Sequence, residues 1–244
     1  MREIRPRFSM VRLVPSFLLL APALAQAQTP GEWPAILQLG GPVVMVLLAM
    51  SVVAFAVSLY KILQLRSYRS SDIFELERAV EHWCHGRTDE ARDSASDNRS
   101  PLAPLLVSGM AWLSFSDDDN QRKIAEAELS RMAQEHLWRL SSKLGVLEQV
   151  SYLAPLLGLL GTVLGIIDVF HGLAGQGSSV DSAFLAGGIW EALLTTAVGL
   201  CVAIPFALLH SAFQSKVESM RQRLQDILSR LFTAPLYRDI SEAG

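Results

Sequence analysis

The sequence predicts an all-α membrane protein with three transmembrane helices, the second and third of which extend into the cytoplasm. Three apolar stretches are each about as long as the 20 residues that a helix needs to cross a bilayer. Charge is segregated: no lysine or arginine lies between Lys143 and Lys216, whereas Lys61 to Lys143 holds twelve basic and fourteen acidic residues. Apolar residues also recur at three- and four-residue steps beside the second and third stretches. The chain therefore alternates between a membrane and water.

Residues 1–27 have the composition of a removable signal peptide. Arginines precede the apolar run "VPSFLLLAPALA", and small residues follow in "ALAQAQ", so cleavage after Ala25 or Ala27 fits. The alternative is an uncleaved membrane anchor, but Pro15 and Pro22 bracket a run too short to span. Residues 28–41 would then form a periplasmic N-terminal segment.

Residues 42–63 form the first predicted transmembrane helix, because "PVVMVLLAMSVVAFAVSLY" at 42–60 contains no charge. Lys61, Arg66 and Arg69 follow it, and no basic residue lies between Gln28 and Pro42. The positive-inside rule therefore puts the C-terminal end of this helix in the cytoplasm and the N-terminus of the chain in the periplasm.

Residues 64–143 form the predicted cytoplasmic helical region. Its last part is a long helix, because apolar residues recur at helical spacing and run straight into the second span. This set comprises Leu129, Ala133, Leu137, Leu140, Leu144 and Leu147. The preceding "SFSDDDNQ" offers an N-cap in Ser116 or in one of Asp117, Asp118 and Asp119.

Two shorter motifs in this region have less effect on the prediction. The prolines of "RSPLAPLL" at 99–106 separate an acidic helical hairpin from the long helix. His82, Cys84 and His85 in "EHWCHG" suggest a metal, but nothing nearby completes a four-ligand set, so we predict no metal and no cofactor. Cys84 and Cys201 lie in segments facing different solvents and are expected to be free thiols.

Residues 144–212 form a predicted transmembrane hairpin, with spans at about 147–170 and 183–210. The connection "HGLAGQGSSVDS" has no basic residue and belongs outside, whereas arginines return after Ala212. Residues 213–244 would then be a cytoplasmic C-terminal helix and tail. Its expected packing face is formed by Val217, Met220, Leu224, Leu228 and Leu231.

Glu191 is the residue of the third span that most needs a functional explanation. A carboxylate at mid-bilayer costs several kcal/mol unless it faces water, a partner or the protein interior. A band of small and hydroxylic side chains surrounds it, and such residues either allow close helix packing or line a cavity. The band consists of Gly187, Gly188, Ala192, Thr195, Thr196, Gly199 and Ala203.

The second span carries a matching set, namely Gly158, Gly161, Gly165 and the hydroxyl of Thr162. A hairpin folded about Gln176–Gly177 would put Thr162 and Glu191 at nearly one depth, since each lies about fifteen residues from the turn. Thr196 would lie about one and a half turns further toward the cytoplasm. Two alternatives stay open: the threonines could bond their own backbone, and the glycines could serve packing alone.

Catalytic chemistry is not predicted. The spans show no set of base, nucleophile and orienting group, since His171 and His210 flank them at opposite faces. Glu148 and Asp168 stand near the two ends of the second span and are interpreted as boundary residues that reach headgroups or water. We therefore expect no enzyme, and a purely structural scaffold remains the alternative to a transport function.

The two hairpin motifs, "APLLGLLGTVLGI" and "GGIWEALLTTAVGLCVAIPF", resemble the ExbB/TolQ/MotA proton-channel family, and its ExbB branch most closely. The resemblance covers residues 147–212 and extends to "GGPVVMVLLAMSVVAFAVSLYKI" around the first span. Residues 66–140 match only in helical character and length. The TolQ branch has a nearly identical membrane core but usually lacks a cleaved signal sequence, and the MotA branch has four spans.

The resemblance implies a multi-pass protein of the bacterial inner membrane that forms a ring-shaped homo-oligomer, with five copies in the family's best-described members. The second and third helices would line a pore around the single-span helices of an ExbD-like partner, whose aspartate carries protons. A TonB-like protein would receive the resulting motion, or TolA in a TolQ-like Tol-Pal system. No nucleic acid is expected as a partner.

The resemblance also assigns residues to the pathway. By motif, the ring's polar residues are Thr162 in "LLGTVLG", Glu191 in "IWEALL" and Thr196 in "ALLTTAVG". Thr195 stands where relatives often have alanine, so its role stays open.

Overall fold

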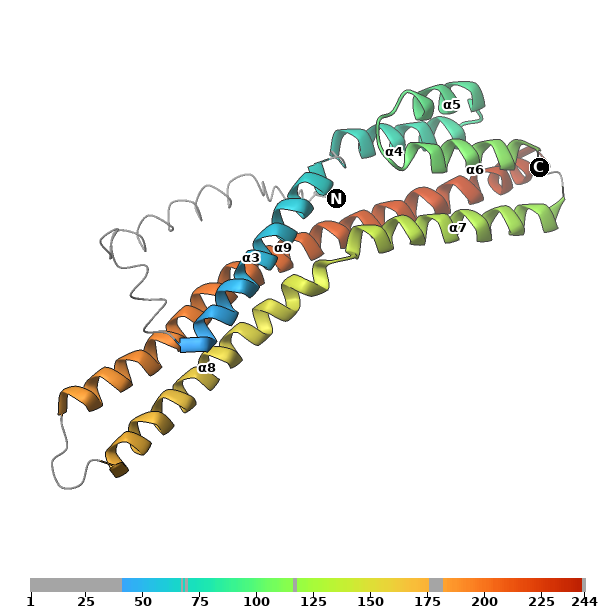
Figure 1. The fold of residues 1–244 in the computed structure, drawn as a ribbon. Helices are drawn as coiled ribbons and strands as arrows, with labels where there is room; N and C mark the ends of the chain where they lie inside the picture. The colour runs from blue at the N-terminus through green and yellow to red at the C-terminus, as the bar shows by residue number, and fades with distance from the viewer. Residues whose placement is uncertain (1–40, 67, 69, 116–117, 176–181, 243–244) are drawn as a thin grey trace, which may run out of the picture. The chain divides into compact units, whose positions relative to one another are not determined.

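The computed structural model describes residues 41–66, 68, 70–115, 118–175 and 182–242, and every regular element within these ranges is an α-helix (Figure 1). The predicted signal peptide, residues 28–40 and the centre of the connection between the second and third spans lie outside the described residues. Three helical stretches are long and apolar enough to cross a membrane: Gly41–Arg66, Asn120–Ala174 and Ser182–Ala234. The prediction of an all-helical protein with three spans is confirmed.

The chain divides into two compact units. The span unit contains Glu148–Ala212 together with the chain up to Ala54, and the bundle unit contains Phe55–Leu147 together with the chain from Phe213. Three long helices supply the apolar spans: α3 (Gly41–Arg66), α8 (Leu144–Gly175) and α9 (Ser182–Glu242). The third span thus continues, without a break, into the helix predicted to follow it.

Within the span unit, α8 and α9 run antiparallel and lie side by side (Figure 1). Glycines make this approach close. A Cβ atom at Gly199 would lie 2.6 Å from the carbonyl oxygen of Ala154, and one at Gly158 would lie 3.0 Å from Cα of Thr196. Because these neighbours are backbone atoms, a larger side chain could not displace them without moving a helix.

The bundle unit contains four further helices, α4 (Ser70–Cys84), α5 (Thr88–Ser96), α6 (Ala103–Phe115) and α7 (Asp119–Ser141). Helix α4 packs on α5, α5 on α6, and α6 on α7. The predicted acidic hairpin corresponds to α4 and α5. However, the prolines after it do not simply separate it from the long helix, because Pro104 lies in the first turn of a further helix, α6. Proline is tolerated there because the first-turn N–H groups have no intrahelical partner.

The C-terminal half of α9 belongs to the bundle. The indole nitrogen of Trp83 in α4 donates to the carbonyl oxygen of Leu231 at 3.2 Å, and Arg223 pairs with Glu77 at 3.0 Å. The predicted packing face is confirmed, since its five members are all buried: Val217, Met220, Leu224, Leu228 and Leu231. The Sγ of Cys84 lies 3.8 Å from the carbonyl oxygen of Arg230, and Cys84 and Cys201 are free thiols as predicted.

The long helix predicted to enter the second span differs from the expectation in one respect. Its N-cap is Asp118, whose carboxylate accepts from the backbone N–H of Asn120 at 3.3 Å, and its six predicted apolar positions are buried. Of the other N-cap candidates, Asp119 is the first residue of α7, and Ser116 and Asp117 lie outside the described residues. The helix is not continuous, however: α7 ends at Ser141 and α8 begins at Leu144.

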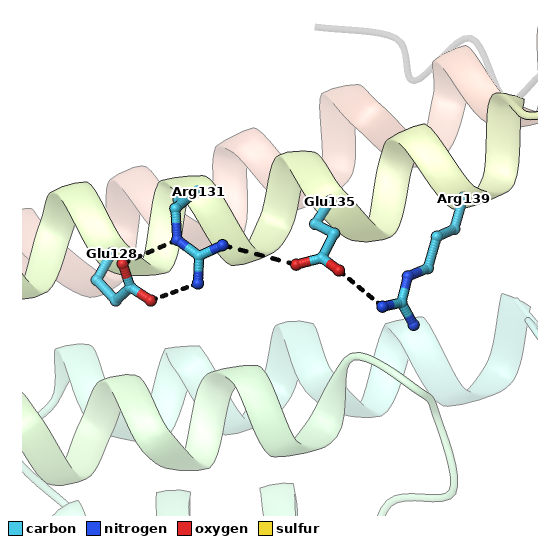
Figure 2. A network of polar contacts seen from close by, with 4 residues as sticks. All are labelled: Glu128, Arg131, Glu135 and Arg139. Carbon is cyan, nitrogen blue, oxygen red and sulfur yellow. Dashed lines mark hydrogen bonds and ion pairs between the residues drawn. The ribbon is translucent and has the colours of Figure 1, made fainter.

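The exposed face of α7 carries a ladder of charged side chains (Figure 2). Arg131 makes hydrogen bonds of 2.6 and 2.9 Å to Glu128 and an ion pair of 3.7 Å to Glu135, which in turn accepts from Arg139 at 2.7 Å. These pairs follow the three- and four-residue spacing that brings side chains together on a helix.

We expect the Glu135→Gln variant, which breaks two steps of this ladder, to lose little stability. Exposed ion pairs contribute weakly and are screened by salt. Thermal unfolding of the purified chain should show a small decrease at low ionic strength that disappears at about 0.5 M salt. Lys123→Gln, which removes an exposed charge on the same helix outside the ladder, is the control. A large, salt-independent loss would show that the ladder has a structural role beyond charge pairing.

Candidate functional site

Contacts between α8 and α9 fix the depth of the candidate residues. Gly161 faces Thr195, Gly165 faces the Cβ atom of Ala192 at 3.0 Å, and Gly172 faces the ring of Phe184. Each pair is centred near residue 178, about two residues beyond the turn assumed from the sequence. The helices are therefore offset from the expected register.

This register corrects the prediction that Thr162 and Glu191 share one depth. Thr162 follows Gly161 and so lies level with Thr195. Glu191 precedes Ala192 and lies about 5 Å, or one helical turn, nearer the connecting segment. The two threonines of α9, rather than Glu191, are thus level with the hydroxyl-bearing turn of α8.

Two hydroxyl groups of α9 converge on one carbonyl of α8. The single proton of Thr195 Oγ1 is shared between the carbonyl oxygen of Ala192 in its own helix (2.7 Å) and that of Gly158 (3.2 Å), and Thr196 Oγ1 donates to the same Gly158 oxygen at 2.9 Å. Because glycine has no side chain, its backbone is open to the neighbouring helix. Thr195 is 4% exposed, whereas Thr196 is only partly buried.

Thr162 is not part of this group. Its Oγ1 donates to the carbonyl oxygen of Leu159 at 2.7 Å, three residues back in its own helix. This is the local backbone bond that was left open as an alternative for the membrane threonines, although the acceptor lies one residue closer than the usual four.

Glu191 is half-buried and lines a cavity of about 340 Å³. The cavity lies between α8 and α9 within the span unit. Its walls are formed by Gly165, Asp168, Val169, Phe184, Gly187, Gly188 and Glu191. Glu191 thus borders a space that can admit water, and water near a carboxyl group lowers the cost of keeping a charge there.

Asp168 was interpreted from the sequence as a boundary residue. In the structure it also lines this cavity, together with Glu191. A signal in the sequence could have shown this. Asp168 lies three residues after Gly165 and seven after Gly161, and residues at these steps lie on one face of a helix. That face is the one that packs against α9.

The first span also reaches this site. A Cβ atom at Gly41, the first residue of α3, would lie 3.9 Å from Oε1 of Glu191. Gly41 has φ +57°, in the left-handed region that glycine adopts without strain, and Pro42 follows in the first turn of α3. Three helices therefore surround the Glu191 carboxyl group.

The small residues of the two spans have different surroundings. A side chain at Gly158, Gly161, Gly165, Gly188 or Gly199 would meet atoms of the facing helix, and Ala192 is buried there. Gly187 has no atom within 4 Å of its ideal Cβ position, although it lines the cavity. Most of this band therefore serves close packing in the single chain, and Gly187 leaves the cavity wide.

The sequence matches known proteins over the same elements. The profile of the MotA/TolQ/ExbB proton channel family matches residues 97–226, more than half of the chain. An ExbB-like biopolymer transport protein 1 of Synechocystis sp. is 38% identical over 209 residues, which cover 81% of this chain and 76% of that protein. The biopolymer transport protein exbB1 of Vibrio cholerae is 37% identical over 102 residues, which cover 42% of this chain and 44% of that protein.

A member of another branch matches to a similar extent. The Tol-Pal system protein TolQ of Pseudomonas aeruginosa is 36% identical over 102 residues, 42% of this chain and 43% of its own length. The match to the Vibrio and Pseudomonas proteins thus spans less than half of their length. The family profile includes Thr162, Glu191 and Thr196 and all of α7 and α8. The chain belongs to the MotA/TolQ/ExbB proton channel family, whose members are transporters rather than enzymes.

Proposed function

We propose that this chain is the channel subunit of a bacterial inner-membrane complex that couples the proton motive force to TonB-dependent transport across the outer membrane. The observation that carries the proposal is the position of Glu191. Glu191 lines a cavity between the two spans that match the family, about one turn from Thr195 and Thr196, whose hydroxyl groups bond α8. No structural task of a packed hairpin requires a titratable group there.

The physics of a membrane carboxyl group supports a coupling role. One elementary charge crossing 100 mV releases about 2.3 kcal/mol. A carboxyl group in an apolar surrounding changes its charge only when that surrounding changes, so protonation and motion become linked. Glu191 would exchange the proton, and Thr162 and Thr196 would supply hydroxyl groups that can donate or accept a hydrogen bond along the pathway.

Partners follow from the same proposal. Several copies of the chain, five by resemblance, would form a ring around an ExbD-like single-span protein with a transmembrane aspartate, and a TonB-like protein would receive the motion. The apolar faces of α8 and α9 outside their mutual contact are available to lipid and to further copies. Their exposed members include Leu156, Leu160, Ile167, Trp190, Leu193 and Leu200. The distribution of basic residues supports an N-terminus in the periplasm and a C-terminus in the cytoplasm.

A TolQ-like role in envelope maintenance is the second candidate, since a TolQ protein matches the chain at similar identity and coverage. Deletion of the gene from its host separates the two roles. Loss of growth on a scarce iron chelate, with an intact envelope, supports the TonB-coupled role. Leakage of periplasmic enzymes and sensitivity to detergent support the TolQ-like role. A deletion strain with neither defect would contradict both and favour a structural scaffold.

We expect Thr196→Val and Thr162→Val to reduce iron-chelate growth about twofold to tenfold without abolishing it. Valine keeps the shape of threonine but cannot donate a hydrogen bond. Thr196→Val removes the bond of 2.9 Å to Gly158, and Thr162→Val removes the bond of 2.7 Å to Leu159. The free energy of one neutral hydrogen bond corresponds to about a twofold to tenfold change. Thr233→Val is a matched control, because Thr233 makes a 2.9 Å bond to the carbonyl oxygen of Ser229 in the bundle half of α9. If Thr233→Val reduced growth as much as Thr196→Val, the hydroxyl groups in the membrane would have no specific role in transport.

A further inference from the structure

Lys61 is a fully buried cation near the end of the first span. Its relative exposure is 0%, although lysine is almost never buried completely unless it is paired. Among the described residues its ammonium group makes no ion pair with a carboxylate. The partners that the described residues give this charge are uncharged oxygen atoms, which offset part of its loss of water.

Backbone carbonyls at the end of α7 provide this compensation. Lys61 Nζ donates to the carbonyl oxygen of Leu140 at 2.9 Å and to Oε1 of Gln64 at 2.7 Å, and Gln64 Nε2 donates to the carbonyl oxygen of Arg139 at 3.5 Å. The last four carbonyls of a helix lack intrahelical partners and carry a partial negative charge. Two neighbouring side chains of α3 thus cap the C-terminus of α7.

Immediately after this cap, the chain leaves the helical conformation. Ser142 is the C-cap residue of α7, and its hydroxyl donates to the carbonyl oxygen of Arg139 at 2.7 Å. Lys143 has φ +66°, the only positive φ of a non-glycine residue among the described residues, and α8 begins at the next position. Lysine has no side-chain group that favours this left-handed conformation, unlike asparagine or glycine.

The local sequence does not require this break. The leucine spacing from Leu129 to Leu147 continues through it unchanged, which is why the sequence predicts one uninterrupted helix. Neither glycine nor proline stands at residues 141–144. Ser141 and Ser142 donate to the carbonyl oxygens of Trp138 and Arg139, and Gly145 follows, so local residues weaken the helix here without dictating a left-handed residue at Lys143. Helix α3 adds contacts both before the break and at Lys143 itself. Besides Lys61, Tyr60 contributes its ring, which lies 4.4 Å below the ammonium group of Lys143.

We infer that Lys61 is a positioning residue, whose ammonium group caps α7 and thereby fixes the point at which α8 begins. Without the cap, the carbonyl oxygens of Arg139 and Leu140 would accept hydrogen bonds from the amides of Lys143 and Leu144. Helices α7 and α8 would then form one continuous helix. Residues 142 and 143 would then be helical, and α8 would rotate about its own axis relative to α7. Thr162 and the glycine face of α8 would rotate with it. This role goes beyond the proposed pathway, since it lies on the first span and at a residue remote from Glu191.

Hydrogen exchange of the purified full-length chain tests the inference. In Lys61→Met, the amides of Lys143 and Leu144 should gain helical partners and exchange about tenfold more slowly than in the unmodified chain. Lys61→Arg keeps the charge and the donors and should restore the original rates. Lys143→Met is the matched control, because it removes the other ammonium group on the Tyr60 ring but leaves the cap intact. Unchanged exchange in Lys61→Met would overturn the inference.

Two further variants keep the test decisive. If Lys61→Met does not accumulate in the membrane, Gln64→Leu removes the second capping side chain and should slow the same amides in the same direction. Adding Lys143→Gly to Lys61→Met should restore the break, since glycine adopts positive φ without strain. General loss of packing would not be repaired in this way, so a failure of this rescue counts against the cap. Because exchange needs no transport, the outcome is independent of whether Glu191 carries protons.

Discussion

We expect the Glu191→Gln variant to reach the membrane and assemble normally but to lose proton-driven activity completely. Glutamine has nearly the same size as glutamate and keeps its hydrogen-bonding capacity, but it cannot bind and release a proton near neutral pH. Glu191 is half-buried beside the N-terminal residue of α3 and lines the cavity shared with Asp168. Growth on a scarce iron chelate should fall to the level of the deletion strain, with the amount of protein checked by blotting.

The control for this variant is a change at the same cavity without a titratable group. Gly187→Ala adds one methyl group to the cavity wall, where no atom lies within 4 Å, and should leave growth unchanged. Glu218→Gln, an exposed glutamate in the bundle half of α9, controls for the loss of a carboxylate as such. Normal growth of Glu191→Gln would refute the proton-carrying role and favour a structural scaffold.

The Gly199→Ala variant should be the most destabilising single-methyl change in the hairpin. The added Cβ atom would lie 2.6 Å from the carbonyl oxygen of Ala154 and 3.1 Å from Cα of Gly158. Both are backbone atoms of α8, so the helices must separate. Overpacking of this kind costs about 1–3 kcal/mol. The melting temperature of the purified chain in detergent should fall by about 5 °C or more, and less protein should accumulate in the membrane.

Gly187→Ala is again the matched control, since it lies on the same helix and its added methyl group would meet no atom within 4 Å. Alanine favours helix over glycine by about 1 kcal/mol, so its melting temperature should stay equal or rise slightly. Equal losses of stability in the two variants would indicate that the added methyl group destabilises α9 wherever it stands, and that contact with α8 is not the cause.

The spans and the packing faces could be predicted from the sequence because they depend on local patterns. Hydropathy over about 20 residues identifies a span whatever its neighbours are, and the positions from Leu129 to Leu147 follow the helical repeat that buries them. The N-cap at Asp118 is local as well, since its carboxylate bonds an amide two residues away.

The register of α8 on α9 could not be predicted in the same way. The register is set by contacts between glycines of one helix and side chains of the other, such as Gly161 with Thr195. It is not set by the midpoint of the connecting segment. The shared cavity of Asp168 and Glu191 depends on this register. The break before α8 depends on the contact of Lys61 with Leu140, which are 79 positions apart in the chain. Non-local contacts of this kind leave no local pattern in either partner.

The carbonyl oxygen of Gly158 accepts hydrogen bonds from both Thr195 and Thr196, so two hydroxyl groups tie α9 to α8 at one point. A carbonyl oxygen offers two lone pairs. If one hydroxyl swings away during a transport cycle, the other still ties the two helices, and the interlocked glycines resist sliding. In the proposed ring, α8 and α9 would therefore move as one rigid pair, and any relative motion would be confined to the contacts of this pair with other copies or with a partner helix.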